Sequence, residues 1–274
     1  MVGSRFVIPP RELDIYLPGK RLAIEFDGLF WHSDANDIIT KAYHVGKTEA
    51  CDEKGIRLIH VFEDEWIEKR RIVESRLKNL LGIYDKTVFA RKCEIKDVAP
   101  REAELFQNSS HVQGSVRAKV RLGLYFENEL VALMIFGKCR FDKRHEWEML
   151  RFCCKLGYHI PGAAGKLLNR FEKTYRPKSL VSYADRRWST GNLYKALGFS
   201  FVRNSPPNYW YVSNTMKRHS RIEFQKHKLK NKLKIYDESK TEVENMKANG
   251  YSRIFDCGNM VFAKEYGDEG VQGS

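Results

Sequence analysis

The chain has 274 residues and a mass of 32.0 kDa, a length that suits one large domain or two modest ones. Its apolar content of 42% excludes wholesale disorder, and no apolar run reaches the roughly 18–20 residues that span a membrane. Six scattered cysteines without a CxxC pair argue against disulfide scaffolds and zinc fingers. The amino end lacks an apolar signal region, so we expect a cytoplasmic protein.

Charge is distributed unevenly along the chain. Lys and Arg number 48 against 35 Asp and Glu, which gives a net charge of +13. Residues 1–90 hold 14 basic and 15 acidic side chains, so the whole excess lies behind them. A near-neutral front part and a basic back part favour a polyanionic partner such as nucleic acid. The alternative is that the charge serves solubility alone.

In chain order, the residue patterns of the first 82 residues predict a compact α/β unit. We expect a strand at 5–8, a hairpin over 12–27, a helix at 38–54, a strand at 57–62 and a helix at 65–81. Gly55 and Gly82 fall just past the two helices, where a C-cap glycine is typical. The helical crossover allows a parallel strand pair.

The rest of the chain predicts a second α/β unit. Strands are expected at 120–126, 130–136, 146–153, 180–184, 199–203, 209–212, 253–255 and 260–263, and helices at 166–175 and 190–197. The predicted domains are 1–90 and 91–266, and the last residues, 267–274, are expected to be disordered.

Acidic residues gather in the predicted hairpin. Glu12 and Asp14 are two apart on one strand, as are Glu25 and Asp27 on its partner, so each pair projects from one face. Like charges at this spacing favour a cation, and Mg²⁺ prefers oxygen ligands. Such an ion can activate a water against a phosphodiester. The alternative is that these carboxylates are ordinary solvated groups near a turn.

Two further residues could complete a reaction site. His32 follows Asp27 by five residues and could transfer a proton. Lys41, His44 and Lys47 share one face of the predicted helix, where a lysine could stabilise developing negative charge. His32 could instead be a structural histidine beside Trp31, and the lysines a hydrated face.

With these residues in view, the front part resembles the very-short-patch-repair-like nucleases, and more narrowly the EDxHD homing endonucleases of phages, a branch of the PD-(D/E)XK fold. The resemblance covers residues 5–82 and is carried by Lys47 and by three segments, ELDIYLP at 12–18, IEFDGLFWH at 24–32 and GIRLIHVFEDEW at 55–66. The chain departs from the usual acidic-x-lysine motif, because Asp27 stands where the lysine would be.

The resemblance implies DNA cleavage with Mg²⁺ or another divalent cation. It implies that Asp14, Glu25 and Asp27 hold the metal, and that His32 and Lys47 join them as catalytic residues. It also implies a mixed sheet with helices, and a bacterial or phage-infected cell as the setting.

Residues 93–213 resemble the fold of GNAT acyltransferases. The resemblance rests on the hairpin at 120–136, the strand at 146–153, the loop HIPGAAG at 159–165 and the stretch NLYKALGF at 192–199. In that family the glycine-rich loop donates backbone N–H groups to the coenzyme A pyrophosphate. His159 stands where Arg or Gln is usual, and Pro161 removes one donor. We therefore expect no coenzyme A site, and a scaffold that holds DNA.

A basic segment follows this part of the chain. Between residues 216 and 236 there are eight basic side chains and one acid, Glu223. The expected contacts to double-stranded DNA are Lys217, Arg218, Arg221, Lys226, Lys228, Lys230, Lys232 and Lys234, together with Arg186 and Arg187. Such a run neutralises phosphates and gives salt-dependent binding. A hydrated helix face is the alternative.

The sequence therefore predicts first a Mg²⁺-dependent DNA endonuclease, a hydrolase of the phage homing or mobile-element kind. The second hypothesis is a GNAT-type acyl or carbamoyl transferase that modifies DNA. The third is a DNA-binding protein without enzymatic activity.

Overall fold

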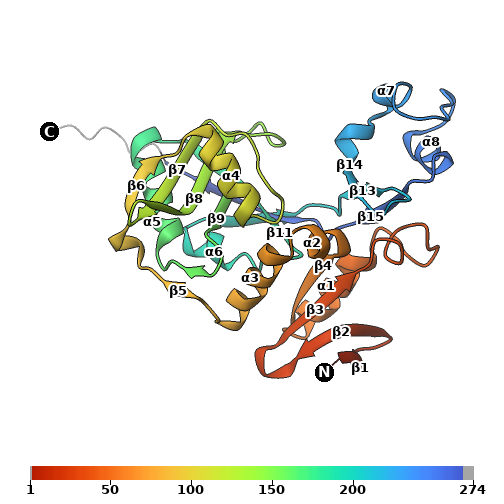
Figure 1. Ribbon diagram of the computed structural model, residues 1–274, viewed down its shortest axis with the longest axis horizontal. Helices are drawn as coiled ribbons and strands as arrows, with labels where there is room; N and C mark the ends of the chain where they lie inside the picture. Colours follow the sequence, from red (N-terminus) through yellow and green to blue (C-terminus); the bar gives the residue numbers. More distant parts are fainter. Residues whose placement is uncertain (1, 268–274) are drawn as a thin grey trace. The chain divides into compact units, whose positions relative to one another are not determined.

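The computed structural model describes residues 2–267 and divides the chain into two compact units (Figure 1). Unit 1 comprises Met1–Glu68, Asp185–Ser189 and Ser205–Asn259, and unit 2 comprises Lys69–Ala184, Thr190–Asn204 and Met260–Ser274. The units interleave along the chain, whereas the predicted domains are consecutive. The predicted tail lies, from residue 268 on, outside the described residues. Within residues 2–267, no helix is long and apolar enough to cross a bilayer.

Unit 1 is built on a four-stranded sheet in the order β1-β2-β3-β4. Its strands are β1 (Val2–Ile8), β2 (Arg11–Leu17), β3 (Leu22–Asp27) and β4 (Arg57–Phe62). The 3-10 turn η1 (Pro18–Lys20) joins β2 to its antiparallel neighbour β3, and the helix α1 (Tyr43–Glu53) leads from β3 to its parallel neighbour β4. Leu13, Ala23, Cys51 and Leu58 form the buried core between sheet and helix. The predicted hairpin and parallel pair are confirmed.

Both helices predicted for this region have different bounds. The first begins only at Tyr43, because residues 28–42 form successive turns in which backbone bonds such as His32 N–H to Gly28 C=O replace a helical ladder. The second is two helices, α2 (Glu63–Glu68) and α3 (Arg70–Leu81), since Lys69 leaves the helical conformation with φ −127° and ψ 28°. The predicted C-cap at Gly82 is confirmed by its φ of 80°.

A smaller layer completes unit 1. Its three-stranded sheet has the order β14-β13-β15. The elements are β13 (Tyr209–Val212), β14 (Arg218–Ser220), the 3-10 turn η3 (Arg221–Phe224), α7 (Lys226–Leu229), α8 (Glu242–Ala248) and β15 (Ser252–Phe255). Tyr211, Phe224, Leu229 and Met246 form its buried core. The basic segment therefore lies on an apolar cluster of its own.

Unit 2 is built on a seven-stranded sheet in the order β12-β16-β11-β9-β8-β7-β6. Its strands are β6 (Glu94–Asp97), β7 (Val120–Phe126), β8 (Glu129–Lys138), β9 (Trp147–Cys154), β11 (Ser179–Asp185), β12 (Ser200–Asn204) and β16 (Asn259–Glu265). Four helices accompany them, namely α3, α4 (Pro100–Ser110), α5 (Ala163–Tyr175) and α6 (Asn192–Ala196). The short elements are β5 (Lys86–Thr87), η2 (Ala90–Lys92) and β10 (Tyr158–His159). The mixed α/β class predicted from the sequence is confirmed.

The two faces of this sheet bury different helices. Met134 and Phe136 of β8 lie in the larger core, where the ring of Phe136 stacks on Phe171 of α5 with centroids 3.7 Å apart. Leu133 and Ile135 point to the other face and share a core with Ala103 of α4. The alternation of side chains along one strand therefore separates α5 from α4.

The strands β9 and β11 are parallel but pair only at one end. The paired residues are Leu180 with Trp147 and Val181 with Glu148. One residue further on, the Ser182 hydroxyl donates to the Met149 carbonyl oxygen at 2.9 Å, so a side chain takes the place of the next backbone partner. Beyond that point β9 continues to Cys154 without β11 beside it.

One glycine of unit 1 is required by a close backbone approach. Gly258 has φ +72°, and a Cβ there would lie 2.3 Å from the Ser205 carbonyl oxygen. We expect Gly258→Ala to lower the free energy of unfolding by at least about 2 kcal/mol more than Gly82→Ala. Gly82 is the matched control, because its φ is +80° but a Cβ there meets nothing within 4 Å. Urea unfolding of both variants measures the difference, and equal losses would contradict the steric explanation.

Candidate functional site

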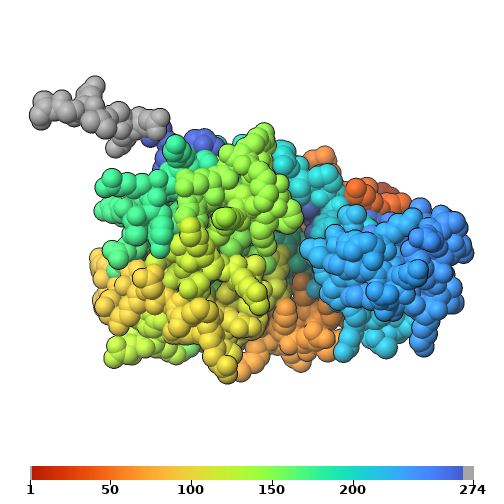
Figure 2. Space-filling view, turned by 90° about the horizontal axis from the view of Figure 1, so that it is seen from above, coloured from red at the N-terminus to blue at the C-terminus, as the bar shows by residue number. Residues whose placement is uncertain are grey.

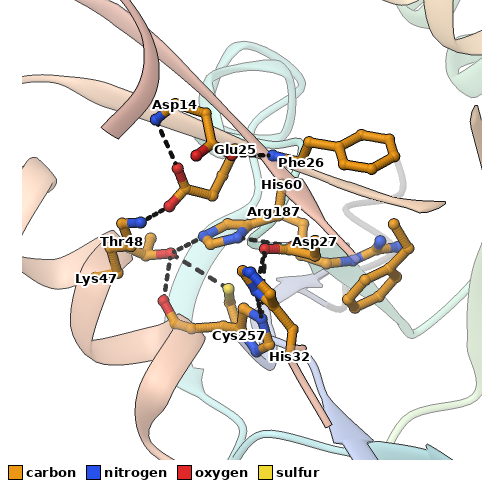
Figure 3. Close-up of polar contacts among 12 residues, drawn as sticks. Asp14, Glu25, Phe26, Asp27, His32, Lys47, Thr48, His60, Arg187 and Cys257 are labelled. Carbon is orange, nitrogen blue, oxygen red and sulfur yellow. Dashed lines mark hydrogen bonds and ion pairs between the residues drawn. The ribbon is translucent and has the colours of Figure 1, made fainter. Parts of the chain in front are cut away.

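The acidic hairpin brings three of the predicted residues into one group (Figure 3). The Asp14 backbone N–H donates to Glu25 Oε1 at 2.9 Å, and the Phe26 N–H donates to Asp14 Oδ2 at 2.7 Å. The Lys47 ammonium of α1 forms an ion pair with Glu25 Oε2. The hairpin and α1 therefore bring Asp14, Glu25 and Lys47 together, as the sequence predicted.

The Lys47–Glu25 pair is buried, because α1 covers this face of the sheet. Burial lowers the pKa of Lys47 to about 8, although the charge of Asp14 opposes that shift. A buried carboxylate needs a partner of opposite charge, and here a lysine provides it. The negative charge of the hairpin is thus balanced within the protein.

Asp27 lies in a second, histidine-rich group. Its Oδ1 is 3.0 Å from His32 Nδ1 and 3.4 Å from His44 Nε2, and its Oδ2 is 3.0 Å from His60 Nδ1. Asp27, His44 and His60 are buried, while the ring of His32 is partly exposed. Burial alone would raise the pKa of Asp27, but the charges of His44 and His60 hold it well below its usual value.

A hydrogen-bond chain extends from this group into the interior of unit 1. His60 Nε2 is 3.0 Å from the Thr48 hydroxyl, which lies 3.2 Å from Cys257 Sγ. Burial lowers the pKa of His60, although the charge of Asp27 and its hydrogen bond oppose that shift. This chain connects residues from β3, α1, β4 and the segment after β15.

The atoms that could hold a metal are not the predicted set. One atom each from Asp27, His32 and His44 lies within 4.8 Å of the others. Two imidazole nitrogens and one carboxylate are a donor set for transition metals, whereas Mg²⁺ takes oxygen ligands. Asp14 and Glu25 instead bind backbone N–H groups and Lys47. The argument that crowded carboxylates require Mg²⁺ is therefore wrong for Asp14 and Glu25, because backbone N–H groups and the Lys47 ammonium already bind their oxygens.

The sequence signals for the missed residues are weak. His44 is marked only by the helix face that it shares with Lys47, and His60 lies inside an apolar strand where no pattern separates a ligand from a core residue. Cys257 is distant along the chain and belongs to no motif.

The predicted DNA contacts divide into buried and exposed groups. Arg187 is 2% exposed and pairs with Asp185 at 2.8 Å and Glu65 at 3.0 Å. Arg218 pairs with Asp64 at 2.8 Å and with Glu65 at 3.1 Å. These two guanidinium groups are used inside the protein and are not presented to a phosphate.

Of the remaining predicted contacts, the Arg186 side chain is only 9% exposed, whereas the others lie closer to the surface. Arg186 is 3.3 Å from the exposed Glu49, and Arg221 is 3.8 Å from Glu242. Lys217, Lys226, Lys230, Lys232 and Lys234 are exposed and Lys228 is half-buried. The segment that holds these lysines is at the surface in Figure 2, in the blue part of the chain.

The buried carboxyl of Asp256 yields a pH prediction for unit 1. Burial, together with the charge of Asp185, raises the pKa of Asp256 to about 6. The hydrogen bonds that its carboxylate accepts from the Asn208 and Gly258 N–H groups oppose this shift. The folded protein therefore binds the proton more tightly than the unfolded chain. Stability that is present at pH 4 should be lost as the pH rises through 6, by about 2–3 kcal/mol.

Urea unfolding at pH 4, 5, 6 and 7 checks this expectation. Asp256→Asn should flatten the pH dependence, whereas the exposed Asp37→Asn should leave it unchanged. A parent protein whose stability rises steadily from pH 4 to 7, with the same slope in the Asp256 variant, would contradict the assignment.

A separate constellation lies in unit 2 at the start of α5. Gly162 precedes the helix with φ 82°, and Ala163 is its first residue. The first N–H groups of a helix lack intrahelical partners. Those of Ala164 and Gly165 have no backbone or side-chain partner among residues 2–267. The predicted start at 166 thus missed the turn that presents these donors.

Tyr194 of α6 lies beside the point where β9 and β11 part. Its hydroxyl is 3.4 Å from the Ser182 hydroxyl, which binds the Met149 carbonyl. Its ring stacks on Phe262 with centroids 4.8 Å apart, which fixes the direction of the phenol. The sequence does not distinguish this tyrosine from the rest of the stretch at 192–199, because the contact of its hydroxyl with Ser182 of β11 forms only in the folded protein.

Comparisons with known proteins found matches among solved structures alone. No family model and no curated protein matches the chain. Among solved structures, it is similar to a GNAT family acetyltransferase from Elizabethkingia anophelis with acetyl-CoA bound, at 15% identity and a TM-score of 0.36, over 64% of this chain and 99% of that one.

Two further structures give similar values. The ribosomal-protein-S18-alanine N-acetyltransferase of Escherichia coli has 10% identity and a TM-score of 0.38, over 66% of this chain and 99% of that one. A Bacillus subtilis acetyltransferase in complex with CoA has 16% identity and a TM-score of 0.35, over 64% and 99%.

These comparisons correct the first functional prediction. The matched structures are acetyltransferases, two of them with a coenzyme A ligand, which contradicts a Mg²⁺-dependent endonuclease and hydrolase of the homing kind. The same finding contradicts the expectation that coenzyme A plays no part. The resemblance of residues 5–82 to PD-(D/E)XK nucleases gains no support from them, whereas the resemblance of residues 93–213 to GNAT folds does.

Proposed function

We propose that unit 2 is an acyltransferase that takes an acyl group from an acyl-coenzyme A. The observation that carries the proposal is that β9 and β11 are parallel, pair at only two positions and part next to the Tyr194 hydroxyl. Parted strands leave backbone groups of β9 available to an extended ligand with amides of its own. The start of α5 supplies donors for its phosphates.

The residues present fit such a donor. The N–H groups of Ala164 and Gly165 would hold the pyrophosphate, and the glycine has open space where a side chain would begin, with only Leu197 at 4.0 Å. The thioester would supply an activated acyl group. The Tyr194 hydroxyl is the group that can hold or give a proton at that place.

Isothermal calorimetry with acetyl-CoA tests the donor site. Gly165→Glu places a carboxylate at the start of α5, and Gly165→Gln is its neutral control. We expect the glutamate to weaken binding at least about tenfold more than the glutamine, and the difference to shrink in high salt. If the parent protein shows no binding of acetyl-CoA, the proposal is wrong.

We also propose that the lysine-rich layer of unit 1 binds nucleic acid. Lys217, Lys226, Lys230 and Lys234 are exposed, and none has a carboxylate partner within the described part of the chain. Their positions on or next to β14 and α7 hold them on one small apolar core. Unpaired, closely spaced ammonium groups favour a polyphosphate.

Fluorescence anisotropy with a duplex DNA tests this partner. Changing the four lysines to Gln should weaken binding and reduce the slope of log K against log salt by up to about 3–4. The control is a variant in which Lys20, Lys41, Lys54 and Lys86 are changed to Gln, because it has the same net charge as the first variant. Equal losses in the two variants would show that only net charge acts.

A further inference from the structure

A cationic cluster in unit 2 acts on His111, the C-cap residue that follows α4. The Lys69 ammonium donates to the carbonyl oxygen of Val112 at 2.6 Å, one residue from the histidine. The pKa of His111 lies well below its usual value, first because of burial and then because of the charges of Arg151, Arg76 and Lys69. The imidazole is thus neutral among three cations.

The remaining proton of His111 is a hydrogen-bond donor. Its Nδ1 accepts the Gln113 N–H at 3.2 Å, so the neutral ring carries its proton on Nε2. The site therefore combines a neutral donor with charged ones, and the acceptor nitrogen of His111 is already used by the Gln113 N–H.

Arg151 is the member of this cluster that β9 contributes. It follows a bulge in β9. Phe136 of β8 faces Met149 and the adjacent Ile135 faces Arg151, so Leu150 is the extra residue without a partner on β8. A bulge redirects the side chain that follows it. One guanidinium nitrogen, Nη1, donates to the Leu150 carbonyl at 2.9 Å, while Nε is buried without a hydrogen-bond partner among residues 2–267. A buried donor without a partner is costly.

The neighbouring carboxylate does not supply that partner. Glu148 is buried and accepts from Arg140, through the Arg140 backbone N–H at 2.9 Å and Nε at 3.1 Å. Burial, followed by the charge of Arg140, lowers the pKa of Arg151 to about 10. The positive charge at Arg151 is therefore undercompensated.

Arg151 also lies next to the proposed reaction site. It belongs to the part of β9 that β11 no longer accompanies, two residues beyond the Met149 carbonyl that Ser182 binds. The Tyr194 phenol is within electrostatic reach of its guanidinium. An anion bound at Arg151 would thus be held beside the proton donor.

We propose that Arg151, with Lys69 and His111 beside it, binds the acid group of the acyl acceptor, so that the acceptor is an amine that carries a carboxylate or a phosphate. The inference rests on the proposed acyltransferase function. In the transfer, the amine nitrogen forms a C–N bond with the acyl carbon as the C–S bond breaks, the amine loses one proton, and sulfur leaves as the thiol. Amines that lack an acid group are disfavoured, because a cationic cluster repels the ammonium form.

Steady-state acetylation of matched amine pairs tests the proposal. β-Alanine is compared with β-alaninamide, and ethanolamine phosphate with ethanolamine, which separates carboxylate from phosphate recognition. In the parent, kcat/KM for one acidic amine should exceed that of its neutral partner at least about tenfold. Arg151→Met should reduce the ratio of the two kcat/KM values to about one, and Arg151→Lys should give an intermediate ratio. Changing the exposed Arg101 to Met should leave the ratio unchanged.

Acetyl-CoA affinity, measured by calorimetry on the same proteins, separates the possible failures. An unchanged Kd in Arg151→Met shows that the variant is folded and that the loss concerns the acceptor. A parent that binds and consumes acetyl-CoA but uses neutral and acidic amines equally overturns the anion site and leaves the acyltransferase in place. A parent that binds no acetyl-CoA overturns both.

Discussion

Arg187→Met is expected to lower the free energy of unfolding of unit 1 by about 3–5 kcal/mol. The side chain is 2% exposed and its guanidinium binds four carboxylate oxygens, both of Asp185 at 2.8 and 3.3 Å and both of Glu65 at 3.0 and 3.1 Å. Removing the cation leaves these carboxylates buried with less positive charge around them. Methionine restores the volume, so the loss reports on charge.

Urea unfolding followed by tryptophan fluorescence measures the effect. Arg70→Met is the control. Arg70 pairs with Glu74 at 2.8 Å, but its side chain is 63% exposed, so this ion pair should contribute less than about 1 kcal/mol to the free energy of unfolding. A loss in Arg187→Met no larger than in the control would show that Arg187 is not needed to hold the acidic residues.

Tyr194→Phe is expected to lower kcat for acetyl transfer by about 10²–10⁴-fold, with the Kd for acetyl-CoA unchanged. The ring stacks on Phe262, and phenylalanine keeps that contact. Only the hydroxyl beside Ser182 is lost. The change therefore removes a proton donor from the reaction site and leaves the packing of α6 as it was.

A pH profile separates this role from a structural one. Loss of a proton donor should remove the alkaline limb of the kcat profile, whereas a packing defect should leave its shape unchanged. Tyr125→Phe is the control, because Tyr125 lies on β7 and its hydroxyl binds Glu102 of α4 at 2.8 Å. A Tyr194 variant with full kcat would contradict the role given to the hydroxyl while leaving acetyl-CoA binding open to its own test.

The two units place different chemistry on one chain. Unit 1 holds a buried Asp27–histidine group and an exposed lysine-rich layer, and unit 2 holds the parted strands and the cationic cluster at Arg151. The calorimetric and DNA-binding experiments address the units separately. Binding of acetyl-CoA in the first experiment and of DNA in the second would together indicate an acyltransferase with a nucleic-acid-binding layer.

Local sequence patterns by themselves determined much of the secondary structure. The alternation in residues 12–27 predicted the hairpin, and with it the approach of Asp14 and Glu25, because two-residue periodicity and a tight turn act within one short segment. The glycine-rich loop at 159–165 and the uneven charge are likewise properties of the residue order alone.

Only the tertiary structure decided what those residues do. Lys47 pairs with Glu25 and three histidines surround Asp27. Arg187 is buried against Glu65, 122 positions away, instead of being exposed to a phosphate. The interleaved units and the parting of β9 from β11 likewise depend on pairings between distant segments. Burial and charge compensation act across such distances in the chain, and periodicity within a short window carries no information about them.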